Sequence, residues 1–199
     1  MAQDGTRGGA SDGTGDGRSD ERDTAPDLSA ALADDDPTAE SKPLTHLSAR
    51  GEAHMVDVGD KDVTQREARA RGALRMAPET RRRLLADDTP KGDVFASARI
   101  AGIQAAKRTA DLIPLCHPLS LNAVSVTIDP DPDDVERVWV EATVRCTGKT
   151  GVEMEALTAA SVALLTLYDM LKGIDREMVI ESVALHEKSG GRRGHYVRG

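Results

Sequence analysis

Two glutamates and an aspartate–lysine pair lie at opposite ends of one apolar segment. Glu153 and Glu155 follow a Gly-Lys-Thr-Gly turn at residues 148–151, and Asp169 and Lys172 come at the end of the apolar run. Carboxylates and lysines act as general acids and bases when their surroundings shift their pKa values. A core helix needs none of these charges, so their presence suggests a chemical role.

Simpler explanations of the same charges remain open on spacing alone. Acidic residues in a first helical turn interact favourably with the helix dipole, by about 0.3–1 kcal/mol. Asp169 and Lys172 have the spacing of a surface ion pair worth about 0.2–0.5 kcal/mol. Gly148-Lys149-Thr150 is similar to the end of a phosphate-binding loop, but that loop requires glycine at position 143, where the chain has threonine. We therefore interpret these glycines as a turn before a helix.

Further candidate residues lie outside this segment. His117 follows Cys116 between two prolines, where a fixed imidazole could act as an acid, a base or a ligand. Metal binding by Cys116, His117 and Cys146 stays an alternative, although the chain has no zinc-ligand spacing. Lys91 precedes a helix start predicted at Asp93, and backbone N–H groups at such a start attract anions.

Composition restricts the class of protein. The chain has 199 residues, of which 39% are hydrophobic and 2% aromatic, and its net charge is -8. Residues 1–42 contain 11 acidic and 4 basic residues and no Phe, Trp, Tyr, Val or Ile. Such a segment cannot bury enough apolar surface to fold, so we expect a disordered acidic tail there and one domain over residues 43–199.

Location and macromolecular partners follow from what the sequence lacks. We find no signal-peptide pattern and no run of 18 apolar residues, so we expect a cytoplasmic protein with no membrane partner. The two cysteines have no CxxC spacing, which suits a reducing compartment. No basic stripe is interleaved with aromatic residues, so we expect no nucleic-acid partner.

Three helices are predicted. Pro78 at a first turn favours a helix over residues 78–85, and Asp93 is expected to cap a helix over 94–110. The apolar segment predicts a helix over 151–172. Its expected core face repeats every three or four residues and consists of Met154, Leu157, Ser161, Leu164, Tyr168 and Leu171.

Strands are predicted between and after these helices. Alternating apolar residues indicate a hairpin of strands at 124–128 and 138–146, and a last strand lies at 178–186. Residues 64–76 are ambiguous, because alanine and arginine favour a helix, whereas a strand would place Arg66, Ala68 and Ala70 on one face. Interspersed helices and antiparallel strands indicate the α+β class.

The length of the helix over 151–172 limits what one chain can do. Glu155 and Asp169 are fourteen positions apart and share nearly one helix face, but they lie roughly 21 Å apart along the axis. One chain cannot easily direct both at one reacting atom. If both are catalytic, we predict that a neighbouring subunit brings them together.

Several long segments together resemble one known family. In chain order they are Gly51–Asp57, Lys91–Ala96, Ala98–Lys107, Asp111–Leu119, Thr147–Thr158, Tyr168–Met170 and Lys188–Gly191. They are similar to the cyclic pyranopterin monophosphate synthases, the MoaC proteins of molybdenum cofactor (molybdopterin) biosynthesis. The likeness covers about Leu44 to Arg193.

The resemblance implies a fold, an assembly and a reaction. The fold would be ferredoxin-like α+β, an antiparallel sheet with packed helices, in a homohexamer built as a trimer of dimers with active sites at subunit interfaces. The reaction would be that of a lyase. It would convert the 3′,8-cyclised dihydro form of GTP, supplied by an upstream radical enzyme, to cyclic pyranopterin monophosphate and pyrophosphate. The family requires no cofactor, and Mg²⁺ on the substrate triphosphate stays an open alternative.

The resemblance also implies roles for residues. Asp169 matches the catalytic aspartate, and Lys91 and Lys172 match essential lysines. We expect Asp169 and Lys172 to act in proton transfer, with Lys91 and His117 as the other catalytic residues. The substrate-binding and site-lining positions are Leu115, Cys116, His117, Glu153, Met154, Glu155, Arg66 and Lys188.

One departure from the family and two rival functions remain. The chain has Arg192-Arg193 where the family commonly has Lys-Ser, and arginine replaces lysine as a phosphate partner but not as a base. A non-catalytic nucleotide-binding scaffold would be expected to lack one of the lysines or Asp169, and all are present. A metal-assisted hydrolase would use His117 and the cysteines.

Overall fold

The computed structural model describes residues 52–192 and 194–199, which belong to one compact unit. The disordered tail expected at residues 1–42 lies outside the described residues. Within them, one strand is followed by three helices, a pair of strands, a long helix and a final pair of strands. This order confirms the α+β class.

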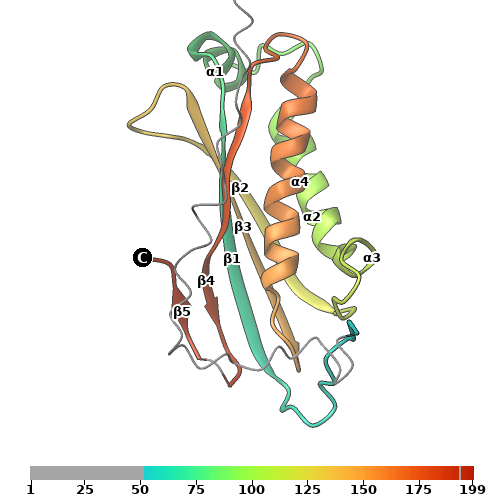
Figure 1. The fold of residues 1–199 in the computed structure, drawn as a ribbon. Coiled ribbons are helices and arrows are strands. Elements are labelled where there is room, and N and C mark those ends of the chain that lie inside the picture. The colour runs from blue at the N-terminus through green and yellow to red at the C-terminus, as the bar shows by residue number, and fades with distance from the viewer. Residues whose placement is uncertain (1–51, 193) are drawn as a thin grey trace, which may run out of the picture. The chain divides into compact units, whose positions relative to one another are not determined.

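The strands form one antiparallel sheet in the order β2-β3-β1-β4-β5 (Figure 1). Their bounds are Thr64–Arg75 for β1, Leu121–Pro130 for β2, Arg137–Gly148 for β3, Val179–Ser189 for β4 and Tyr196–Val197 for β5. The β2–β3 hairpin places β3 beside β1, and β4 pairs with the other edge of β1. This is the ferredoxin-like arrangement, extended by β5 at one edge.

β1 is a strand, so the helix that its composition favoured is wrong. It pairs along its whole length with β3 and over most of its length with β4. Ala68 and Ala70 lie fully buried on the face toward the helices, while Arg69 and Arg71 lie on the other face. Pairing on both sides and burial of one face outweigh the weak helix propensity of alanine and arginine.

The helices cover one face and one end of the sheet. α2 (Val94–Lys107) and α4 (Glu153–Leu171) lie side by side on one face, and α1 (Pro78–Leu85) lies at the end of the sheet where α4 stops (Figure 1). The Asp93 side chain caps α2 as predicted, accepting the Ala96 N–H at 2.8 Å. The helix expected over 94–110 instead ends at Lys107, and the short α3 (Thr109–Leu112) follows.

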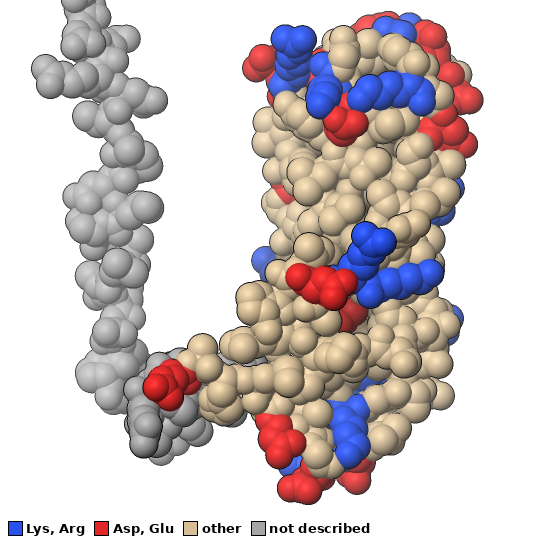
Figure 2. Space-filling view, turned by 90° about the vertical axis from the view of Figure 1, so that its right-hand side faces the viewer, with Lys and Arg blue, Asp and Glu red and all other residues tan. Residues whose placement is uncertain are grey.

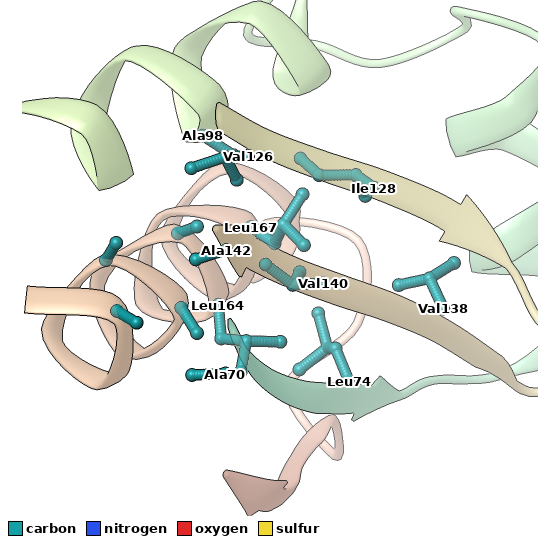
Figure 3. Close-up of a cluster of buried hydrophobic side chains, with 14 of the residues drawn as sticks. Ala70, Leu74, Ala98, Val126, Ile128, Val138, Val140, Ala142, Leu164 and Leu167 are labelled. Carbon is teal, nitrogen blue, oxygen red and sulfur yellow. The ribbon is translucent and has the colours of Figure 1, made fainter. Parts of the chain in front are cut away.

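The core lies between the sheet and α4, and the face that α4 buries is richer in alanine than expected (Figure 3). Leu164 and Leu171 are buried as predicted, but Met154 is 38% exposed. The buried residues of α4 include Ala156, Ala159, Ala160, Ala163 and Leu167. These positions require small residues because α2 lies close to α4. A Cβ at Gly102 in α2 would be 2.9 Å from the Ala159 carbonyl oxygen in α4.

Among the described residues, α4 alone is long and apolar enough, by length and composition, to cross a membrane. In the structure most of its alanine and leucine side chains are buried, and the helix packs against the sheet and α2. Its apolar character is therefore that of a core helix.

Candidate active site

A cavity of about 920 Å³ lies at the end of the sheet where β1 begins and β3 ends. This end of the sheet is at the bottom of Figure 1. Five segments contribute to its wall: residues 56–66, 113–117, 149–155 and 188, and the turn at 190–192. The antiparallel topology explains why these segments come together, because the start of β1, the end of β3 and the end of β4 lie at the same end of the sheet. The turn after β3 then starts α4 at the same place.

The cavity gathers most of the predicted site residues. Eight of them line it: Arg66, Leu115, Cys116, His117, Glu153, Met154, Glu155 and Lys188. Lys91, Asp169 and Lys172 do not line it and form a separate cluster at the opposite end of α4. Within one chain, the predicted site residues therefore form two separate groups rather than one.

Glu155 is a buried carboxyl group in the cavity wall. It is 3% exposed, and its Oε1 accepts a hydrogen bond from the Cys116 Sγ at 3.6 Å. Its Oε2 is buried and has no hydrogen-bond partner among the described residues. Burial raises the pKa of Glu155 above its usual value, which favours the protonated form. Glu155 is thus suited to hold and donate a proton.

Cys116 is suited to remain a neutral thiol. Burial, followed by the nearby charge of Glu155, raises the pKa of Cys116 to about 11. A thiolate is the form that attacks substrates and binds metals, and it is disfavoured here. The metal alternative for Cys116, His117 and Cys146 also lacks geometric support, since no three metal-ligating side chains gather anywhere in the described ranges.

A cationic wall faces these acidic groups. Lys188 Nζ lies 3.5 Å from Glu153 Oε1, and the Arg66 Nε–H donates to the Gly148 carbonyl at 3.3 Å. The cavity lining also contains three cations that sequence reasoning did not assign: Lys61, Lys149 and Arg192. Five cations against three carboxylates give the cavity the positive potential that a phosphorylated ligand requires.

Two side chains fasten the segment that precedes β1 across the cavity. His117 Nε2 lies 2.9 Å from the Val56 carbonyl oxygen, and because a carbonyl only accepts, Nε2 carries the proton and donates it. The Lys149 ammonium donates to the Gly59 carbonyl. Lys149 lies in the Gly-Lys-Thr-Gly turn, so this turn both precedes α4 and supplies a cation to the cavity wall.

The second cluster joins Asp169 to two lysines. Asp169 Oδ1 lies 2.7 Å from Lys172 Nζ, and Asp169 Oδ2 lies 3.0 Å from Lys91 Nζ. Lys91 also donates to the Asp169 backbone carbonyl at 2.8 Å. Hydrogen bonds from Lys172 and then Lys91 hold the pKa of Asp169 below its usual value, so Asp169 stays ionised and orients both ammonium groups.

Asp175 fixes the elements that bring this cluster together. Its Oδ2 accepts the Ala77 N–H at 2.9 Å and the Thr80 hydroxyl at 3.0 Å, which ties the start of α1 to the turn after α4. The loop between α1 and α2 carries Lys91. This tie therefore holds the Lys91 loop near the end of α4, and sequence patterns gave no sign of it.

Comparisons with known proteins match most of the chain to one family. The model of the MoaC family matches residues 55–191. A cyclic pyranopterin monophosphate synthase of Roseiflexus sp. (strain RS-1) is 64% identical over 154 residues, 77% of this chain and 97% of that protein. Proteins of the same name from Herpetosiphon aurantiacus and Pelotomaculum thermopropionicum are 61% and 58% identical over 153 and 155 residues. These matches cover 77% and 78% of this chain and 93% and 91% of the two relatives.

The matched region contains every residue of the cavity wall that we have discussed except Arg192, together with the Lys91–Asp169–Lys172 cluster. A family match over more than half of the chain and identities near 60% over three quarters of it leave no other assignment. The chain belongs to the MoaC family.

Proposed function

We propose that this chain is a lyase of molybdenum cofactor biosynthesis that converts the 3′,8-cyclised dihydro form of GTP to cyclic pyranopterin monophosphate and pyrophosphate. The relatives are named for that product, and the chain aligns with nearly their whole length. The observation that carries the proposal is the cavity itself, in which five cations and a buried glutamate lie together. Such a site suits a small molecule with a polyphosphate and ionisable ring nitrogens.

The cations would hold the triphosphate. Forming the cyclic phosphate breaks a P–O bond and leaves charge on the departing pyrophosphate, and nearby cations stabilise that charge. Arg66 and Lys188 are held by contacts within the cavity wall, and Lys61, Lys149 and Arg192 add charge around them. Arg192 suits this task, because binding a phosphate requires a permanent cation rather than a base.

The carboxyl groups and lysines would move the protons. Burial raises the pKa of Glu155, and this carboxyl group would donate a proton to the ring system in the cavity. Asp169 stays ionised between Lys91 and Lys172, and Lys172 would take part in proton transfer beside it. His117, held at Val56, would position the base and the ribose-derived part.

The assembly would bring these two groups together. Asp169 and Glu155 lie roughly 21 Å apart along α4, too far to serve one reacting atom within a chain. Figure 2 shows an uncharged area on the face of the helices, between the charged side chains at its top and a charged group a little below its middle. Ile100 and Leu165 are 58% and 57% exposed, and α4 has no charged residue from Ala156 to Tyr168. We propose a homohexamer, a trimer of dimers, in which a neighbour's lysine–aspartate cluster completes each cavity.

The remaining partners follow from the same proposal. A radical enzyme acting upstream would supply the cyclised nucleotide, and the reaction would need no resident cofactor, with Mg²⁺ as a companion of the triphosphate. We propose the cytoplasm as its location, where the free cysteines Cys116 and Cys146 stay reduced. We propose neither a membrane nor a nucleic acid as a partner.

Incubation of the purified chain with the cyclised nucleotide tests the proposed function. We expect pyrophosphate and cyclic pyranopterin monophosphate in equal amounts, measured by a coupled phosphate assay and by fluorescence of the oxidised pterin. Absence of both products would refute the proposal. Activity retained in the presence of a chelator would exclude the metal-assisted hydrolase that His117 and the cysteines left open.

A further inference from the structure

The turn after β4 contains two glycines with left-handed backbone angles, Gly190 and Gly191. Gly190 has a φ of 89° and Gly191 a φ of 75°, values that favour glycine. Both also lie against neighbours that leave no room for a side chain. A Cβ at Gly190 would overlap the Gln65 carbonyl oxygen, and a Cβ at Gly191 would overlap Nη1 of Arg66.

The two neighbours differ in what they can do when displaced. The Gln65 carbonyl is part of the backbone of β1, the central strand, so Gly190 is needed for the close approach of two backbone segments at the start of β1. Nη1 of Arg66 is the far end of a flexible side chain and can move aside. A side chain at Gly191 would therefore displace the Arg66 guanidinium rather than the backbone of the sheet.

Arg66 is held from two sides. Its Nε–H donates to the Gly148 carbonyl in the turn between β3 and α4, and its guanidinium lies against the backbone of Gly191. Lys188 and Arg192, on either side of the glycines, line the same cavity as Arg66. An arginine binds phosphate best through two parallel N–H groups, so its orientation matters as much as its charge.

We propose that Gly191 is a positioning residue, whose missing side chain leaves the space that orients the Arg66 guanidinium toward the phosphate groups of the substrate. This inference rests on the proposed function for the identity of the substrate. The anion-binding geometry is independent of the proposed function, because inorganic pyrophosphate can probe it directly.

The chain offers a matched control in the same segment. Gly194 also has a left-handed φ, of 64°, but a Cβ there would meet nothing within 4 Å. Gly191→Ala and Gly194→Ala thus introduce the same kind of backbone strain, and only the first displaces Arg66. A difference between the two variants reports on the guanidinium.

The decisive experiment measures pyrophosphate binding by titration calorimetry and substrate kinetics on the full-length chain. We expect Gly191→Ala to raise the Kd of pyrophosphate and the KM by about 10- to 100-fold, as for one lost charge-assisted hydrogen bond, with a smaller change in kcat. Gly194→Ala should stay within about two-fold of the wild type for both constants. Equal losses in the two variants would overturn the proposal.

An Arg66→Ala background provides the second test. There the guanidinium is absent, so Gly191→Ala should cause no further loss of pyrophosphate binding, and its melting temperature should fall only as far as that of Gly194→Ala. Losses that multiply in this background would assign Gly191 a merely structural role. If the wild type binds pyrophosphate but does not turn over the cyclised nucleotide, the proposed function fails while this inference stands or falls on the binding data.

Discussion

Burial raises the pKa of Glu155, and this has a consequence for stability. The pKa of Glu155 is raised above its usual value of 4.5, chiefly by desolvation. Between the usual and the raised value, the folded protein therefore binds more protons than the unfolded chain. The free energy of unfolding consequently falls as the pH rises through this window.

Replacing Glu155 by glutamine should remove this pH dependence. Below about pH 4.5 the Glu155→Gln variant and the wild type should have similar free energies of unfolding. Above the window the variant should be more stable by about 1–3 kcal/mol, the usual cost of a buried polar group without its partner. Denaturant titrations over a pH series measure this difference. A constant difference at every pH would mean that Glu155 is not the titrating group.

Asp169 and Lys172 form an exposed pair whose importance is catalytic in our proposal. Asp169→Asn and Lys172→Ala should each lower kcat by about 10²- to 10⁴-fold, the range for loss of a general acid or base, while the melting temperature changes little. The pair of Glu79 and Arg82 in α1 has the same spacing and is a matched control. Glu79→Gln should leave kcat unchanged. Near-normal turnover of the Asp169 and Lys172 variants would refute their assigned role.

At the scale of elements, the contact between α2 and α4 depends on small residues. A Cβ at Gly102 would lie 2.9 Å from the Ala159 carbonyl oxygen and 3.2 Å from the Ala163 Cβ. Gly102→Ala should therefore destabilise the fold by about 1–3 kcal/mol through overpacking. Gly173, where a Cβ would meet nothing within 4 Å, is the control, and Gly173→Ala should stay within about 0.5 kcal/mol. Denaturant midpoints at one pH compare the two variants.

The elements differ in how far the sequence alone could predict them. Pro78 and Asp93 act locally, so the bounds of α1 and the start of α2 could be predicted. The β2–β3 hairpin could be predicted because alternation of apolar residues is also a local pattern. β1 could not be predicted, because its state depends on pairing with β3 and β4, which are remote in sequence. Leu164 and Leu171 on the buried face of α4 were predicted, but its alanines were missed, because close packing selects alanine, whose pattern is weaker than that of leucine.

The site shows the same division between local and remote information. Glu153 and Glu155 could be singled out from their place beside the Gly-Lys-Thr-Gly turn. The contact of Lys91 with Asp169 joins positions 78 residues apart, and only the tertiary structure brings them together. Lys61 and Arg192 likewise face the cavity because the ends of β1 and β4 meet there. The spacing of residues along the sequence does not indicate such contacts between remote segments.

At the scale of the whole molecule, α4 carries one functional group at each end. Glu155 belongs to the cavity at its start, and Asp169 belongs to the lysine cluster at its end. Roughly 21 Å along the helix separates the two positions, so we propose that a single chain holds two incomplete sites. Our central claim is that a neighbouring chain completes each site.

Mixed oligomers test this claim most directly. The Glu155→Gln and Asp169→Asn variants would each be inactive alone, and they would be unfolded together and refolded as a one-to-one mixture. If each site takes Glu155 from one chain and Asp169 from its neighbour, random mixing leaves about a quarter of the sites intact, and turnover should recover to about that fraction of the wild-type rate. Mixed oligomers that form and yet show no turnover would contradict the claim, because both residues would then have to act within one chain.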